Sequence, residues 1–117
     1  MTRAEAVRAL EDRAGMCERT ANAHIDNRTD SFAAYRARIR ATVYRAYVDE
    51  VEGAMPVLAS DPHRTVANIL VSMRRNVSAK VGSRWGASDS QWQFPDTYGM
   101  ADDLVRGALA SEGVEDG

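Results

Sequence analysis

Apolar residues recur at alternating three- and four-residue steps along most of the chain, which is the spacing of one face of a helix. The first such stretch, about residues 2–25, begins with Thr2 and Glu5 at the spacing of a capping box. Many side chains in its stripe are small, so a neighbouring helix can approach closely, but the stripe buries little area. The stripe consists of Val7, Leu10, Ala14, Cys17, Ala21 and His24.

Residues 31–55 predict a helix with two apolar faces. The first face consists of Phe32, Tyr35, Ile39, Val43, Ala46 and Tyr47. The second face, about 100° further round the helix, consists of Tyr44, Val48, Val51 and Met55. Such a helix needs two sets of neighbours. We therefore expect it either to be the central helix of the domain or to bind a partner along the second face. Gly53 and Pro56 should end it.

A third helix is predicted to begin with Asp61 as its cap and Pro62 in the first helical position. Continuing its apolar period would bury Lys80 and Arg84, so the helix is expected to end near residues 80–82. Its apolar face consists of Val66, Ile69, Leu70, Met73 and Val77.

The periodicity is lost between residues 82 and 99, where glycines and turn-forming residues surround half of the aromatic side chains. These aromatics are Trp85, Trp92, Phe94 and Tyr98. A last helix is predicted over residues 100–109, followed by an acidic tail, residues 111–117, that should fray. The pattern predicts an all-α fold. We expect a small single-domain bundle of about four helices over residues 1–110, with an aromatic-rich irregular loop near the C-terminus.

Composition fits one ordinary soluble domain: 117 residues, 44% of them hydrophobic, with a net charge of −2. A net charge of −2 does not by itself favour binding to nucleic acid or to an anionic membrane. No apolar stretch is long enough to span a bilayer, and the first residues are too polar for a signal peptide. With a single cysteine, Cys17, the sequence predicts a cytoplasmic protein without a disulfide framework or a membrane partner. Lys80 is the only lysine among the 15 basic residues, an arginine bias that is typical of GC-rich genomes.

Charge is unevenly distributed along the chain. Residues 31–48 carry a local charge of +4 and residues 62–88 a local charge of +5, whereas residues 96–117 carry −5. The basic stretches are open to two interpretations: a phosphate-binding surface, or a surface over which the acidic segments fold. The second stretch contains Arg64, Arg74, Arg75, Lys80 and Arg84.

The aromatic stretch has three interpretations, of which stacking on nucleic-acid bases is disfavoured because the stretch lacks interleaved basic residues. Large side chains can seal the end of a small bundle, and we favour this lid role for most of Trp85, Trp92 and Phe94. Exposed tryptophan is, however, enriched at the energetic centres of protein interfaces. Trp92 is the best single candidate for exposure, because Gln91 and Gln93 flank it.

No constellation of residues indicates catalysis or a cofactor. Cys17 lies on an apolar stripe, where a thiol behaves as a small hydrophobe with a raised pKa. Asp102 and Asp103 are adjacent, so their side chains diverge by about 100° on a helix and cannot face each other. The candidates for a metal site are weak, because paired histidines and paired cysteines at ligand spacing are missing. These candidates are Glu18, His24, Asp26 and His63.

The sequence thus favours a non-enzymatic interaction protein that binds another protein or a second copy of itself. Its partner-binding residues would be Tyr44, Val48, Val51, Met55 and Trp92. The alternative is a nucleic-acid-binding accessory protein that uses Arg64, Arg74, Arg75, Lys80 and Arg84 on the third helix. Small size, arginine bias and the lack of catalytic motifs are the profile of bacterial or phage accessory proteins.

Overall fold

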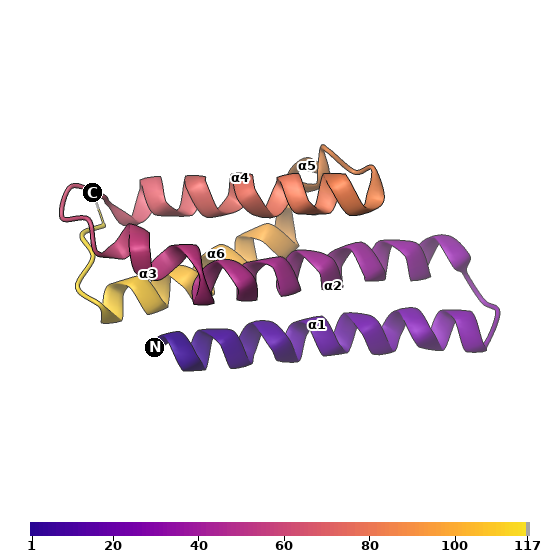
Figure 1. Cartoon of the computed structure of the whole chain (residues 1–117). Helices are drawn as coiled ribbons and strands as arrows, with labels where there is room; N and C mark the ends of the chain where they lie inside the picture. The colour runs from indigo at the N-terminus through magenta and orange to yellow at the C-terminus, as the bar shows by residue number, and fades with distance from the viewer. Residues whose placement is uncertain (117) are drawn as a thin grey trace.

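The structure, a computed structural model that describes residues 1–116, consists of helices joined by short connections (Figure 1). The helices are α1 (Arg3–Asp26), α2 (Ser31–Glu52), α3 (Ala54–Ala59), α4 (Val66–Trp85), α5 (Ser90–Gln93) and α6 (Pro95–Ser111). No strand occurs within these residues, so the all-α prediction is confirmed. The expected number of helices was too low, because α3 and α5 occupy segments that were predicted to be a helix end and a loop.

Local capping determines where the first two helices begin. Thr2 and Glu5 form the predicted capping box at the start of α1, with hydrogen bonds of 2.9 and 3.1 Å. Asp30 caps α2 by accepting a hydrogen bond of 3.0 Å from the Ala33 N–H. Pro56 does not end α2, contrary to expectation. It lies in the first turn of α3, where its missing N–H removes no intrahelical hydrogen bond.

The predicted limits of the third helix were wrong at both ends. Thr65, not Asp61, caps α4, because Thr65 and Asn68 exchange hydrogen bonds of 3.0 and 3.3 Å. At the other end, Lys80 is not buried and does not stop the helix. Val81 takes the buried position, and α4 continues to Trp85 and ends at Gly86, whose φ of 67° suits glycine.

α1 and α2 form a long antiparallel hairpin, against which α4 and α6 pack (Figure 1). The molecule is elongated, with principal extents of 51 × 26 × 20 Å. In Figure 1, α6 runs along the half of the hairpin nearer the N-terminus and stops short of the loop that joins α1 to α2. The far half has its own small core of Ala21, Ala34 and Ala37, consistent with the close approach that small side chains permit.

The second face of α2 belongs to the core, so the hypothesis of a docking surface there is wrong. Tyr44 and Val48 are 6% and 8% exposed, and Val51 and Met55 are fully buried. α1, α3, α4 and α6 all pack against α2, which is therefore the central helix. None of the helices among residues 1–116 has an apolar stretch that would reach across a bilayer.

The aromatic stretch is mostly helical and was wrongly expected to be an irregular loop. Trp85 ends α4, Ser90–Gln93 forms α5, and α6 already begins at Pro95. Phe94 is buried and Trp85 half-buried, so the burial expected of a lid is seen for Phe94 and in part for Trp85. Trp92 is 82% exposed, which confirms the prediction for that residue.

The acidic tail, which the sequence predicted to fray, contacts the body of the protein where the structure describes it. Glu112 forms an ion pair with Arg3 of α1. The Glu115 carbonyl accepts a hydrogen bond of 2.8 Å from the Val66 N–H, and Val114 packs against the core. These contacts connect the end of the chain to the starts of α1 and α4. Gly117 lies outside the described residues.

Candidate binding surfaces

The outward side of α4 is a weakly charged surface. Opposite the buried side chains, α4 presents Val71, Ser72 and Arg75, and Arg75 is the only charged residue at the centre of that face. Two shallow hollows lie on either side of Arg75. The first, about 420 Å³, is lined by Ala54, Val57, Leu58, Ser72, Arg75 and Asn76. The second, about 230 Å³, is lined by Val71, Arg74, Arg75 and Gln91.

Val57 and Val71, two of the most exposed apolar side chains of the protein, line these hollows, and the most exposed one, Trp92, follows Gln91 on α5. Val57 of α3 is 71% exposed, Val71 of α4 56%, and Trp92 of α5, next to Gln91, 82%. α3 lies toward the start of α4 and α5 toward its end (Figure 1). We use the name outer strip for five residues that line the two hollows together with the exposed neighbour of Gln91: Val57, Val71, Ser72, Arg75, Gln91 and Trp92.

α5 holds Trp92 in place although the indole itself is exposed. The backbone N–H of Trp92 donates to the Asp89 carbonyl at 2.9 Å, and the Gln93 side chain donates to Asp89 Oδ1 at 2.8 Å. The buried Ser90 hydroxyl is 2.6 Å from the Tyr98 hydroxyl, which ties α5 to the core. The indole is therefore displayed on an anchored turn, so little backbone order would be lost when a partner covers it.

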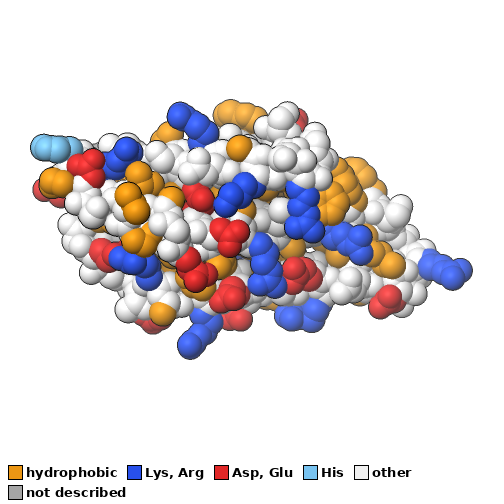
Figure 2. Space-filling model, viewed as in Figure 1, with side chains coloured by type: hydrophobic (Ala, Val, Ile, Leu, Met, Phe, Trp, Pro, Cys, Tyr) orange, Lys and Arg blue, Asp and Glu red, His pale blue; other side chains and the backbone are white. Residues whose placement is uncertain are grey.

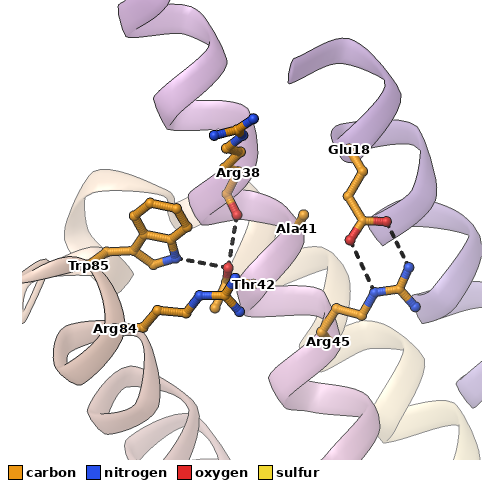
Figure 3. A pocket seen from close by; sticks show the side chains of 7 residues that line it. All are labelled: Glu18, Arg38, Ala41, Thr42, Arg45, Arg84 and Trp85. Carbon is orange, nitrogen blue, oxygen red and sulfur yellow. Dashed lines mark hydrogen bonds and ion pairs between the residues drawn. The ribbon is translucent and has the colours of Figure 1, made fainter. Parts of the chain in front are cut away.

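A second surface feature is a groove of about 480 Å³ between α2 and the end of α4, with one residue from α1 (Figure 3). We call it the cationic groove. It is lined by Glu18, Arg38, Ala41, Thr42, Arg45, Arg84 and Trp85. In Figure 2, basic and acidic side chains are interspersed over the middle of this face, beside an apolar patch near the end of α4.

Hydrogen bonds fix the walls of the cationic groove. Trp85 Nε1 donates to Thr42 Oγ1 at 2.9 Å, and Thr42 in turn donates to the Arg38 carbonyl at 2.9 Å (Figure 3). Arg45 extends toward α1 and donates two hydrogen bonds to Glu18, at 2.8 and 3.3 Å. These hydrogen bonds lower the pKa of the Glu18 carboxyl, with a smaller contribution from the charge of Arg45.

The five basic residues predicted to bind nucleic acid do not share a face. Arg64 lies 3.7 Å from Asp61, Lys80 lies 3.5 Å from Glu50, and Arg74 pairs with Asp102. Arg75 belongs to the outer strip and Arg84 to the cationic groove. Acids of α2, of α6 and of the connection before α4 thus pair with three of the five residues, and of these acids only Asp102 belongs to the acidic stretch of residues 96–117.

The structure instead groups Arg84 with Arg38 and Arg45, which the sequence analysis missed as a site. One available signal was the seven-residue spacing of Arg38 and Arg45, which places both on one side of α2. Arg36 and Arg40 obscured it, because they made the arginines of α2 look scattered. Both of these pack over the ring of Phe94, at 4.7 and 5.3 Å from its centroid.

The weak metal candidates are not brought together. Within residues 1–116 no group of three or more His, Cys, Asp or Glu side chains could hold a metal ion. His24 Nδ1 is 2.9 Å from Thr29 Oγ1 at the end of α1, and His63 is exposed in the connection before α4. Burial raises the pKa of the Cys17 thiol, as predicted from its place on the apolar stripe.

The carboxylate of Asp102 binds other side chains of the protein core. It is buried, its Oδ1 accepts a hydrogen bond of 2.9 Å from the Tyr47 hydroxyl, and its Oδ2 pairs with Arg74. Both carboxylate oxygens are therefore engaged within the protein. Asp103 is exposed, so the two aspartates diverge as their spacing predicted.

Comparison of the chain with protein-family models, with curated proteins and with solved structures gives no match.

Proposed function

We propose that this protein is a non-enzymatic protein-interaction module that binds another protein chain through the outer strip. The observation that carries the proposal is Trp92, an indole that is 82% exposed on an anchored turn. Tryptophan anchors of this kind dominate the binding energy of many interfaces. Covering an indole removes about 150–250 Å² from water, which favours association by about 4–6 kcal/mol before ordering and desolvation are subtracted.

The chemistry of the strip supports a protein partner rather than a polyanion. Val57, Val71 and Trp92 are apolar, and Arg75 is the only charge among the strip residues; Arg74, which also lines the second hollow, is paired with Asp102. A nucleic acid would require several cations to replace its counterions. The partner surface that fits best is apolar with one carboxylate opposite Arg75. A second copy of this chain is one special case, because each copy would contribute its own Trp92.

A nucleic-acid function for the third-helix residues has weaker support. Arg64, Arg74 and Lys80 each lie beside a carboxylate, so binding phosphate there would break existing ion pairs. Such binding should also weaken steeply with salt. Binding through the outer strip should depend little on salt, and this difference separates the two functions.

The first test is self-association, measured by sedimentation over a wide range of protein concentration. If a dimer forms, Trp92→Ala and Val71→Asp should abolish it, while Met16→Ala, an exposed apolar control on α1, should leave it intact. If the protein stays monomeric, the proposal requires a different partner chain.

The second test selects displayed peptides or small domains for binding to the whole protein. Selected binders should weaken about 30-fold or more with Trp92→Ala, as for a hot-spot truncation of about 2 kcal/mol or more. The same binders should tolerate Met16→Ala. A monomeric protein whose selected binders all ignore Trp92 would overturn the proposal.

A further inference from the structure

The cationic groove has a local charge that suits a small anion. Its lining contains three arginines and one glutamate, a formal net charge of +2. Arg38 and Arg84 form no ion pair within the described residues, whereas Arg45 is held by Glu18. The groove thus offers two guanidinium groups without a carboxylate partner and a third that is already oriented.

The other arginines of α2 are engaged elsewhere, which distinguishes the groove from the general basic character of this helix. Arg36 and Arg40 lie over the ring of Phe94. Arg38 is exposed on the other side of the helix, where it lines the groove. In Figure 3, Arg84 extends from α4 toward α2.

The other polar groups that line the groove already have hydrogen-bond partners within the protein, so they do not occupy the arginine side chains. The Trp85 indole N–H and the Thr42 hydroxyl are used in the chain of hydrogen bonds that ends on the Arg38 carbonyl. The Trp85 carbonyl, near the negative end of α4, accepts a hydrogen bond of 3.2 Å from the Tyr35 hydroxyl. The edge of the Tyr35 ring also packs against the indole, with ring centroids 5.6 Å apart. The Arg38 and Arg84 guanidinium groups therefore keep free donors, although Arg84 also lies over the Trp85 ring, 5.4 Å from its centroid.

The row of basic side chains on this side of α2, Arg38 and Arg45, is short. Beyond Arg45 the same side of α2 continues with Asp49 and Glu52, which are exposed and acidic. Glu18 closes the side toward α1. A nucleic-acid strand, with a charge on every phosphate, would meet these carboxylates, whereas one or two phosphate groups would not.

We propose that the cationic groove binds a small molecule through a phosphate monoester or pyrophosphate group, held by Arg38, Arg45 and Arg84. Guanidinium groups donate parallel hydrogen bonds that match phosphate oxygens. The formal charge of +2 on the lining balances such a dianion. The volume of about 480 Å³ is within the range of small-molecule sites, so a phosphorylated metabolite such as a nucleotide would fit. This inference is independent of the outer strip, with which the groove shares no residue.

The experiment uses the full chain with Trp92→Phe, which leaves Trp85 as the only indole and makes its fluorescence a report on the groove. Inorganic pyrophosphate and ADP are titrated at low ionic strength, with calorimetry as a second readout. Both should bind. Equal affinities would identify the phosphate group alone as the ligand, and tighter binding of ADP would identify a nucleotide; either result supports the proposal.

Charge variants test where the phosphate binds. Arg84→Gln and Arg38→Gln should each weaken pyrophosphate binding about tenfold, the loss of one charge-assisted contact. Glu18→Gln should tighten it, because removal of the acid raises the charge of the lining. Arg106→Gln, an exposed arginine on α6, is the matched control and should change the affinity less than about twofold.

Three results would overturn the inference. The first is that neither pyrophosphate nor ADP binds to a protein whose helical circular dichroism shows it to be folded. The second is that Arg106→Gln weakens binding as much as Arg84→Gln, which would mean non-specific attraction. The third is that single-stranded DNA binds while pyrophosphate does not.

Discussion

The Tyr47 hydroxyl on α2 donates a hydrogen bond of 2.9 Å to the buried carboxylate of Asp102 on α6. Arg74 on α4 pairs with the other oxygen of the same carboxylate. One buried charge thus connects three of the helices that form the main core. Breaking such a network leaves its remaining members desolvated without partners, which is more costly than the loss of a surface ion pair.

We therefore expect Asp102→Ala to lower the free energy of unfolding by about 2–3 kcal/mol. The upper part of the range for buried pairs does not apply, because the Arg74 side chain is 42% exposed and can be rehydrated. Tyr47→Phe removes one hydrogen bond and should lower it by about 1 kcal/mol. Urea unfolding measures both. Asp103→Ala, an exposed neighbour, should stay within about 0.5 kcal/mol of the wild type; an equal effect there would refute the network.

The same substitution should have opposite effects at a buried position on the second apolar face of α2 and at an exposed position on α3. Val51→Glu should abolish cooperative folding, because Val51 is fully buried and the carboxylate would have no partner. Val57→Glu, at a position that is 71% exposed, should leave the protein folded. Circular dichroism during urea unfolding distinguishes them. A folded Val51→Glu variant would mean that this part of α2 is not core.

Periodicity predicted the elements whose signals are local. The capping box of Thr2 and the exposure of Trp92 could be predicted because each depends on residues within a turn of the site. The second face of α2 could not be assigned, since a pattern shows that Tyr44 or Val51 is apolar but not which helix covers it. The cationic groove was missed for a related reason. It exists because α4 continues past Lys80 and brings Arg84 beside α2, and this continuation depends on packing.

Alkaline pH should destabilise the fold through its buried tyrosines. Burial raises the pKa of Tyr44, Tyr47 and Tyr98 above the ordinary value of 10.0. A group whose pKa is raised in the folded state binds its proton more tightly there than in the unfolded chain. Its contribution is therefore complete below pH 10.0 and is lost as the pH rises toward the folded pKa.

Above pH 10.0, we thus expect the tyrosinate absorbance of these three residues to rise together with the loss of helical circular dichroism. Tyr47→Phe removes one of the groups and should make the pH dependence of stability shallower in this range. Complete ionisation of all four tyrosines while the helices remain intact would contradict the prediction.

Two arginines of α2, Arg36 and Arg40, lie over the ring of Phe94 and should stabilise its burial. Arg36 lies between two rings, 4.7 Å from the centroid of Phe94 and 5.7 Å from that of Phe32, and its aliphatic stem shields apolar surface. Arg36→Ala should lower the free energy of unfolding by about 1 kcal/mol, and Arg36→Lys by less, because the charge over the rings is kept. Arg38→Ala is the matched control on the same helix and should change stability by less than about 0.5 kcal/mol. Urea unfolding again provides the comparison. If Arg36→Ala proves as neutral as Arg38→Ala, packing among the helices alone keeps Phe94 buried. Arg36 and Arg40 would then be available for other partners.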